Sequence, residues 1–263
     1  MSKPFVSGFV IGLALLLVCG VGASRLRQKD TKNRDLETEK YQTEVLDATP
    51  VRMGTLTAKQ RIHSKLYSHY SELTNNLPGD KTISETVAHS KSTIIERSVE
   101  IGLGELLTEP EAPETYLGEL ARSSDLIIRG RVTKRASQIT EDDTFLFTDY
   151  DVIISDVFKN NADAPVDAGK TIAVTRPGGK VLVNGVVVKA TDMAYAALPV
   201  NTNDVVVFLQ FIPETGAYKT TRATGAFELE ASTVRPLTGV PFPPGVIRDS
   251  DSFLETIRAV SNK

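Results

Sequence analysis

Residues 176–190 read RPGGKVLVNGVVVKA, and this short stretch carries two turn signals between valine-rich runs. Asn184-Gly185 predicts a β-hairpin, because a type I′ turn needs positive φ at both central residues. Pro177-Gly178-Gly179 offers the same backbone freedom for a second tight reversal. The side chains around both turns include no nucleophile and no proton shuttle. We therefore interpret this stretch as framework and not as an active site.

Strand-like patterns extend on both sides of this hairpin and define a β-rich domain over residues 116–240. Residues 125–134 alternate between apolar and polar positions, as expected of a half-buried strand. In residues 145–159 the apolar parity changes, and a β-bulge near Thr148 and Asp149 would reconcile the two halves. We predict an α+β chain whose body is a small antiparallel β-barrel or sandwich, with an OB-like Greek key as the first choice.

Residues 5–23, FVSGFVIGLALLLVCGVGA, are apolar except for Ser7. At about 1.5 Å per residue, such a helix nearly spans a hydrocarbon core of ~30 Å. Residues 1–23 are therefore predicted to be a signal peptide or a membrane anchor, and the membrane is the predicted partner of residues 5–23. Cys19 before Gly20 suggests lipidation as an alternative, although Val18 stands where such sites need a small residue.

The flanks of this segment give conflicting signs of topology. Basic residues, including Arg25, Arg27 and Lys29, follow the apolar run, and the positive-inside tendency would keep them in the cytoplasm. The order of a positive start, an apolar run and small residues instead fits a secretory signal. We predict an extracytoplasmic protein, anchored or secreted, and keep a cytoplasm-facing anchor as the alternative.

The remaining segments divide by composition. Residues 24–54 are charged and are interpreted as a solvated spacer, while residues 55–107 are predicted to be a helical segment. That segment holds two expected helices, one with Thr57 as its N-cap and one over residues 84–102. Residues 108–115 read as a linker. Residues 241–263 are expected to form a proline strap and a C-terminal helix, capped by Asp249, Ser250 or Asp251.

Composition excludes several classes of function. Cys19 is the only cysteine, so a disulfide within one chain is impossible. The formal net charge is −3, and a basic groove with interleaved aromatic residues is what nucleic-acid binding requires. We therefore predict no nucleic-acid partner.

Histidine usage limits the chemistry further. The three histidines, His63, His69 and His89, all lie in the helical segment, and the β-rich domain has no histidine or cysteine for zinc. A Ser-His-Asp arrangement fails for the same reason unless the helical segment docks over the β-rich domain. We assign no catalytic residue and no cofactor-binding residue, and predict no cofactor.

One acidic loop remains as a metal candidate. Glu141, Asp142 and Asp143 lie between two predicted strands, and their carboxylates are candidate Ca²⁺ ligands. The spacing matches no EF-hand, and acidic β-turns are common without a metal. We therefore assign no metal site and keep these three residues as the calcium alternative.

Four runs carry a resemblance: SSDLIIRGRVTK at 123–134, TDYDVIISDVFKN at 148–160, TIAVTRPGG at 171–179 and DVVVFLQF at 204–211. They resemble a group of uncharacterised exported bacterial proteins that pair an N-terminal signal or anchor with this β-rich domain. The resemblance covers roughly residues 120–230 and rests on packing and turn residues. It implies a fold and a cell-envelope address, but it implies no activity and no site residue.

Two functions remain in competition. The leading hypothesis is a non-enzymatic, exported or membrane-tethered module that binds a protein or a cell-envelope component. The alternative is an envelope hydrolase whose catalytic residues are shared between the helical segment and the β-rich domain. An enzyme should bring His63, His69 or His89 to a serine or carboxylate in a pocket, whereas a binding module should show an exposed patch without such a cluster.

Overall fold

The computed structural model describes residues 38–52, 54–68, 70, 82–99, 113–239 and 249–261. The chain divides into two compact units, residues 1–47 and 48–263. In the first unit, residues 38–47 form a helix. The apolar run 5–23 and Cys19 lie outside the described residues. Within the described ranges, no helix is both long and apolar enough to cross a membrane.

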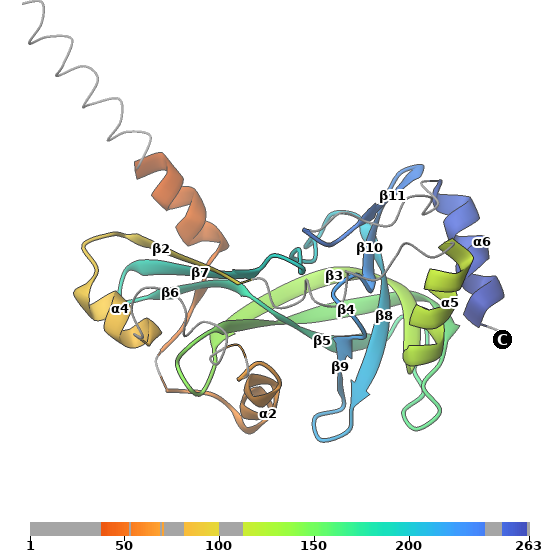
Figure 1. Ribbon diagram of the computed structural model, residues 1–263, viewed down its shortest axis with the longest axis horizontal. Coiled ribbons are helices and arrows are strands. Elements are labelled where there is room, and N and C mark those ends of the chain that lie inside the picture. Colours follow the sequence, from red (N-terminus) through yellow and green to blue (C-terminus); the bar gives the residue numbers. More distant parts are fainter. Residues whose placement is uncertain are drawn as a thin grey trace, which may run out of the picture. The chain divides into compact units, whose positions relative to one another are not determined.

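The second unit contains strands and short helices (Figure 1). In chain order these are β1 (Thr49–Pro50), α2 (Ala58–Leu66), α4 (Ile83–His89), β2 (Ile94–Val99), α5 (Pro113–Ser123), β3 (Leu126–Ile139), β4 (Leu146–Lys159), β5 (Thr171–Pro177), β6 (Gly179–Val183), β7 (Val186–Asp192), β8 (Asp204–Ile212), β9 (Ala217–Thr220), β10 (Ala226–Glu230), β11 (Thr233–Pro236) and α6 (Ser250–Ser261).

The strands form two sheets. The larger, seven-stranded sheet has the order β11-β10-β8-β3-β4-β5-β9, and β8 pairs with β9 as well. Hydrogen-bonded neighbours therefore run from β3 through β4, β5, β9 and β8 back to β3. The β5–β9 pairing is parallel, while the other pairings of this sheet are antiparallel. The predicted α+β class with a strand-rich body and a C-terminal helix is confirmed. The predicted antiparallel barrel is not, because the described strands form mixed sheets without a closed barrel, and β5 pairs with β9 in parallel at only two positions.

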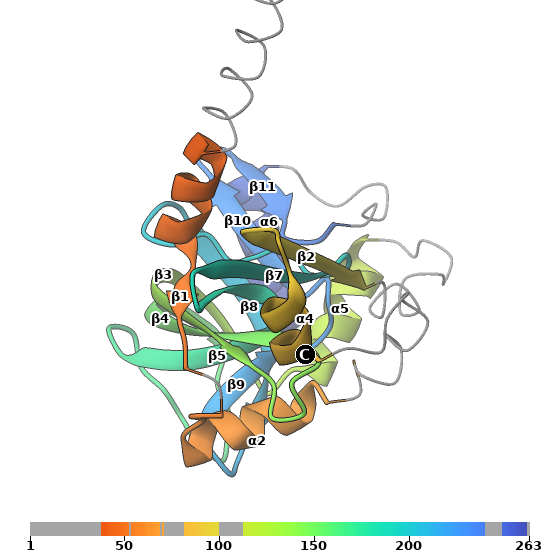
Figure 2. The same ribbon diagram turned by 90° about the vertical axis from the view of Figure 1, so that its left-hand side faces the viewer.

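The smaller, four-stranded sheet has the order β1-β6-β7-β2. Figure 2 shows α4 against this sheet, and Ile83 and Val87 of α4 share a hydrophobic cluster with Val181 and Val188. Helices α5 and α6 lie side by side at one end of the larger sheet (Figure 1).

Three buried clusters hold these layers together. The first is built mainly from side chains of β3, β4, β5, β8 and β9. The second lies between the four-stranded sheet, α2, α4 and the β3–β4 connection. The third lies beneath α5 and α6, where Leu117 and Leu120 meet Phe253 and Ile257, all fully buried. Burying a side chain of this size contributes about 1.5–3 kcal/mol, so both helices belong to the folded body.

The hairpin prediction at residues 176–190 is confirmed. Asn184 and Gly185 have φ of 50° and 79°, as a type I′ turn requires, and they join β6 to β7. The interpretation as framework also holds for Arg176, which is 1% exposed. Its guanidinium donates to the carbonyls of Ala196 at 2.8 Å and Leu237 at 3.3 Å. Burial lowers the pKa of Arg176. The side chain thus hydrogen-bonds the β7–β8 connection and the segment after β11 to strand β5.

The position of the predicted bulge was wrong. Thr148 and Asp149 pair in continuous register with Ser137 and Ala136, and the register shifts of β3 and β4 lie elsewhere, one of them at Gly130. A Cβ on Gly130 would lie 2.5 Å from the carbonyl oxygen of Ile153, so glycine is required by this close approach. The apolar parity changes at Phe147 because both faces of β4 are covered there, with Phe147 in the second cluster and Tyr150 in the first.

The predictions for one helix and for one linker also need correction. The helix expected over 84–102 ends at His89, and Ile94–Val99 is instead strand β2, which pairs in parallel register with β7 from Val187 to Asp192. Residues 108–115 are predicted to be a linker, but α5 begins within this range, at Pro113. The C-terminal helix is confirmed, and Asp249 caps it, since Asp249 Oδ1 accepts from Ser252 N at 2.9 Å. Residues 240–248 of the predicted proline strap lie outside the described residues.

Candidate functional site

Helix α2 docks on the β-rich body and brings a histidine to it. Thr57 begins the helix with a capping box, since Thr57 Oγ1 accepts from Gln60 N and Gln60 Oε1 accepts from Thr57 N. This start turns His63 and Ser64 inward, where both are fully buried. The docking that the sequence left open therefore occurs, and it buries His63.

His63 links three separate elements. Its Nδ1 lies 2.8 Å from Asp149 Oδ1 on β4, and its Nε2 lies 3.0 Å from Thr215 Oγ1 in the β8–β9 turn. The ring also meets Phe147 edge-on, at 6.5 Å between centroids. With a neutral imidazole, Nδ1–H donates to the carboxylate and the Thr215 hydroxyl donates to Nε2. We name His63, Asp149 and Thr215 the His63 cluster.

The His63 cluster has the bonding order of a Ser-His-Asp triad, with threonine in the nucleophile's place. Its surroundings differ from those of a triad. His63 is 0% exposed, and the amides next to the hydroxyl are engaged, since Thr215 N and Gly216 N both donate to Ile212 O. Ala217 N lies 3.4 Å from Thr215 Oγ1 and points at the hydroxyl itself. These amides therefore do not form an oxyanion hole.

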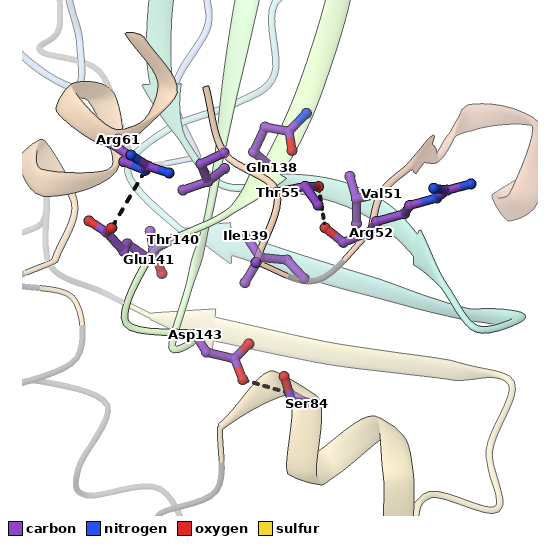
Figure 3. Close-up of a pocket in the computed structure, with 12 residues that line it drawn as sticks. Val51, Arg52, Thr55, Arg61, Ser84, Gln138, Ile139, Thr140, Glu141 and Asp143 are labelled. Atoms are coloured by element: carbon purple, nitrogen blue, oxygen red, sulfur yellow. Dashed lines mark hydrogen bonds and ion pairs between the residues drawn. The ribbon is translucent and has the colours of Figure 1, made fainter. Parts of the chain in front are cut away.

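A groove of about 300 Å³ opens on one side of α2 (Figure 3). Residues 51, 52 and 54–56, the end of β3 and the β3–β4 loop line it, together with Arg61 of α2 and Ser84 of α4. Figure 3 shows Arg61 pointing toward Glu141 across the groove. The two side chains are 3.8 Å apart and more than half exposed. We name this space the Arg61 groove; neither His63 nor Thr215 lines it.

The acidic loop that was considered for calcium shapes this groove instead. Asp143 adopts a positive φ of 59°, its carbonyl accepts from Ile83 N and its Oδ2 accepts from Ser84 N at 3.1 Å. Glu141 faces Arg61, and Glu141 N donates to Ser64 Oγ at 2.7 Å. Asp142 is exposed. In the described part of the chain, no three His, Cys, Asp or Glu side chains are grouped to hold a metal ion.

Of the other two histidines, only His89 is described, and it takes no part in this site. His89 is exposed, and its Nδ1 donates to Glu85 O one helical turn earlier, at 2.8 Å. His69 lies outside the described residues. Asp149 and Thr215 were missed as partners of His63 because they are 86 and 152 positions away along the chain. No local pattern in the sequence connects residues at such separations.

Buried tyrosines continue from the His63 cluster into the second hydrophobic cluster. Tyr67 stacks on Phe147 at 6.1 Å, and Tyr70 stacks on Phe145 at 4.5 Å. The Tyr70 hydroxyl donates to Asp192 Oδ2 at 2.8 Å. Burial raises the pKa of both Tyr67 and Tyr70 far above the ordinary value, and the Asp192 carboxylate adds to the effect on Tyr70. These hydroxyls therefore stay neutral and serve packing.

Comparison with known proteins adds no family. Neither a scan against protein-family models nor a search of curated proteins finds a match for this chain.

Proposed function

We propose that this protein is a non-enzymatic module, exported or membrane-tethered, that binds a protein or a cell-envelope component. The observation that carries the proposal is the Arg61 groove, a concave site lined by apolar side chains and by exposed charges of both signs. Sites of this kind suit recognition, because apolar walls supply area and a few placed polar groups fix orientation. The resemblance to exported bacterial proteins supports the proposed address.

The exposed ion pair that lines the groove can be replaced by contacts to a ligand. The Arg61–Glu141 pair is exposed and 3.8 Å long, and such pairs contribute only about 0–1 kcal/mol. Charged groups of a ligand would therefore replace the internal pair at little cost. The apolar lining residues Val51, Leu56 and Ile139 would contact apolar parts of the same ligand.

We also propose that the body is OB-like. Support comes from the ring of neighbours β3-β4-β5-β9-β8, the return pairing of β8 with β3, and the parallel β5–β9 pair. OB folds bind ligands across the face of their second and third strands and through the loops beside it. Here that face would be β4 and β5, with the β3–β4 loop and the β8–β9 turn beside it. Helix α2 contacts both connections, through Ser64 and His63.

Site-specific photo-crosslinking in cells tests the binding proposal. A photoreactive residue at Gln138, which lines the Arg61 groove, should give a discrete crosslinked species. The same residue at Arg122, whose side chain is 75% exposed on α5, should not. Arg61→Glu should abolish the Gln138 product. Equal products at both positions, or a product insensitive to Arg61→Glu, would contradict the proposal.

The proposed address needs its own test. Protease added to intact spheroplasts should digest residues 48–263 of an exported protein. Digestion that requires rupture of the membrane would contradict export and favour the cytoplasm-facing alternative. Fractionation of the same cells separates an anchored form from a secreted one.

A second candidate function, an envelope hydrolase, is favoured by the bonding order of the His63 cluster. The burial of His63 and the engaged amides beside Thr215 argue against it. The test is ester hydrolysis by the full-length protein and by Thr215→Val and His63→Gln. We expect no turnover that depends on either side chain, and turnover lost in both variants while they remain folded would establish the hydrolase.

A further inference from the structure

A second groove, of about 450 Å³, opens on another part of the β-rich body. Its walls come from the start of β5, the β4–β5 connection, β9 and the end of β8, and Lys59 of α2 lies at its rim. Neither Arg61 nor Glu141 lines it, so it is separate from the Arg61 groove. We name it the β5 groove. A role for this surface goes beyond the binding proposed for the Arg61 groove, and it specifies a ligand and a binding mode for part of the β4–β5 face.

Strand β5 is paired unequally on its two sides. Its pairing with β4 runs from Thr171 to Pro177, whereas its pairing with β9 covers only Val174 and Thr175. Within the described residues, Thr171, Ile172 and Ala173 therefore have a strand neighbour on one side only. The other side faces the β5 groove, which these three residues line.

The hydrogen-bond phase of the ladder tells which backbone groups face the groove. Just before β5, Ile154 N donates to Lys170 O, and just after it, Gly178 N donates to Leu146 O. Hydrogen-bonded positions alternate along an antiparallel pair, so the even-numbered residues of β5 bond to β4. The N–H and C=O groups of Thr171 and Ala173 point the opposite way, toward the groove side. The parallel pairing of Val174 with Tyr218 engages the Ala173 carbonyl, so the open groups are the N–H and C=O of Thr171 and the N–H of Ala173.

The side chains around this edge offer apolar contacts and two unlike charges. Phe211 and Tyr218 line the groove, with ring centroids 5.2 Å apart, and Val166 of the β4–β5 connection lines it as well. Lys59 and Asp151 lie at the rim. In the part of the chain that the structure describes, neither the Lys59 ammonium nor the Asp151 carboxylate has an ion-pair or hydrogen-bond partner.

We propose that the β5 groove binds an extended peptide segment of a partner protein, which adds to the open edge of β5 as a further strand. Main-chain bonds to Thr171 and to the Ala173 N–H supply affinity, and side chains of the added segment supply specificity, as in other cases of strand addition. The three edge residues span about 10 Å at ~3.3 Å per residue. The segment carries an acidic residue for Lys59, a basic residue for Asp151 and an apolar residue for the aromatic wall.

The test begins with a random peptide library panned against the full-length protein in detergent micelles. Selected peptides are synthesised with a fluorophore, and their Kd is measured by anisotropy. Lys59→Glu should weaken binding about fivefold, the upper range for an exposed ion pair. Lys65→Glu, the same change at an exposed position of α2 outside the groove, should leave Kd unchanged. Replacing the peptide's acidic residue by lysine should restore binding to Lys59→Glu.

A second pair of variants tests the main-chain contact. Thr171→Pro removes one groove-facing N–H at the first residue of a strand, where proline is tolerated, and should weaken binding about tenfold. Thr171→Val keeps the N–H and should bind normally. Thermal melts confirm that each variant is folded.

Three results would overturn this inference. One is that the library yields no binding peptide, and another is that bound peptides ignore both Lys59→Glu and Thr171→Pro. The third is that binding responds only to Arg61→Glu. That last result would place the peptides in the Arg61 groove, leaving the proposed function standing while removing the β5 groove as a docking surface.

Discussion

Replacing His63 by leucine separates a structural role of the His63 cluster from a catalytic one. The substitution places an apolar side chain of similar bulk at a fully buried position. It removes the only side chain through which α2 reaches Asp149 and Thr215 in the described residues. If the cluster is an anchor for α2, the loss appears in the free energy of unfolding.

The magnitude follows from the two bonds. A hydrogen bond to a charged group contributes about 1.5–3 kcal/mol, and a neutral one about 0.5–1.5 kcal/mol. The Asp149 side chain is 19% exposed, so water replaces part of the lost bond and the first figure falls toward its lower end. His63→Leu should therefore cost about 2–3 kcal/mol. Asp149→Asn keeps an acceptor oxygen for Nδ1–H and should cost about 1 kcal/mol, as should Thr215→Val.

The assay is guanidinium unfolding of the full-length protein in micelles, followed by far-UV circular dichroism and tyrosine emission. Tyrosine is the natural probe, since the chain has seven tyrosines and no tryptophan. A double-mutant cycle between His63→Leu and Thr215→Val isolates their coupling, which for bonded residues is about 0.5–3 kcal/mol. A His63→Leu protein within about 0.5 kcal/mol of wild type would refute the anchoring role.

Three further predictions rest on other parts of the fold. Burial raises the pKa of Tyr67, Tyr70 and Tyr150 in the folded protein, so their stabilising contribution is present below the unfolded pKa of about 10 and is lost as pH rises above it. Absorbance titration should show these three tyrosines ionising only when the protein unfolds. Ionisation of all seven tyrosines in the folded protein would contradict their burial. Gly130→Ala should destabilise by about 1–3 kcal/mol or more through its clash with the β4 backbone, whereas Gly118→Ala, with open space on α5, should stabilise by about 0.5–1 kcal/mol. The Tm measured with calcium should equal the Tm measured with a chelator. A Tm that rises with calcium concentration would instead support a calcium site in the β3–β4 loop.

Some features of this protein are determined by neighbouring residues and can be predicted from the sequence. The hairpin at Asn184-Gly185 is one, because positive φ is a local property of those residue types. The capping box of α2 is another, because Thr57 and Gln60 are three positions apart. The α+β class and the C-terminal helix follow from the same kind of short-range pattern.

Tertiary structure decided the features that depend on distant partners. Ile94–Val99 has apolar spacing that suits a helix, but parallel pairing with β7 makes it a strand. Phe147 and Tyr150 are both buried without a bulge between them, because separate cores cover the two faces of β4. His63 meets Asp149 and Thr215 only once α2 docks on the larger sheet. Contacts between residues so far apart depend on how whole elements pack, and no local pattern records that packing.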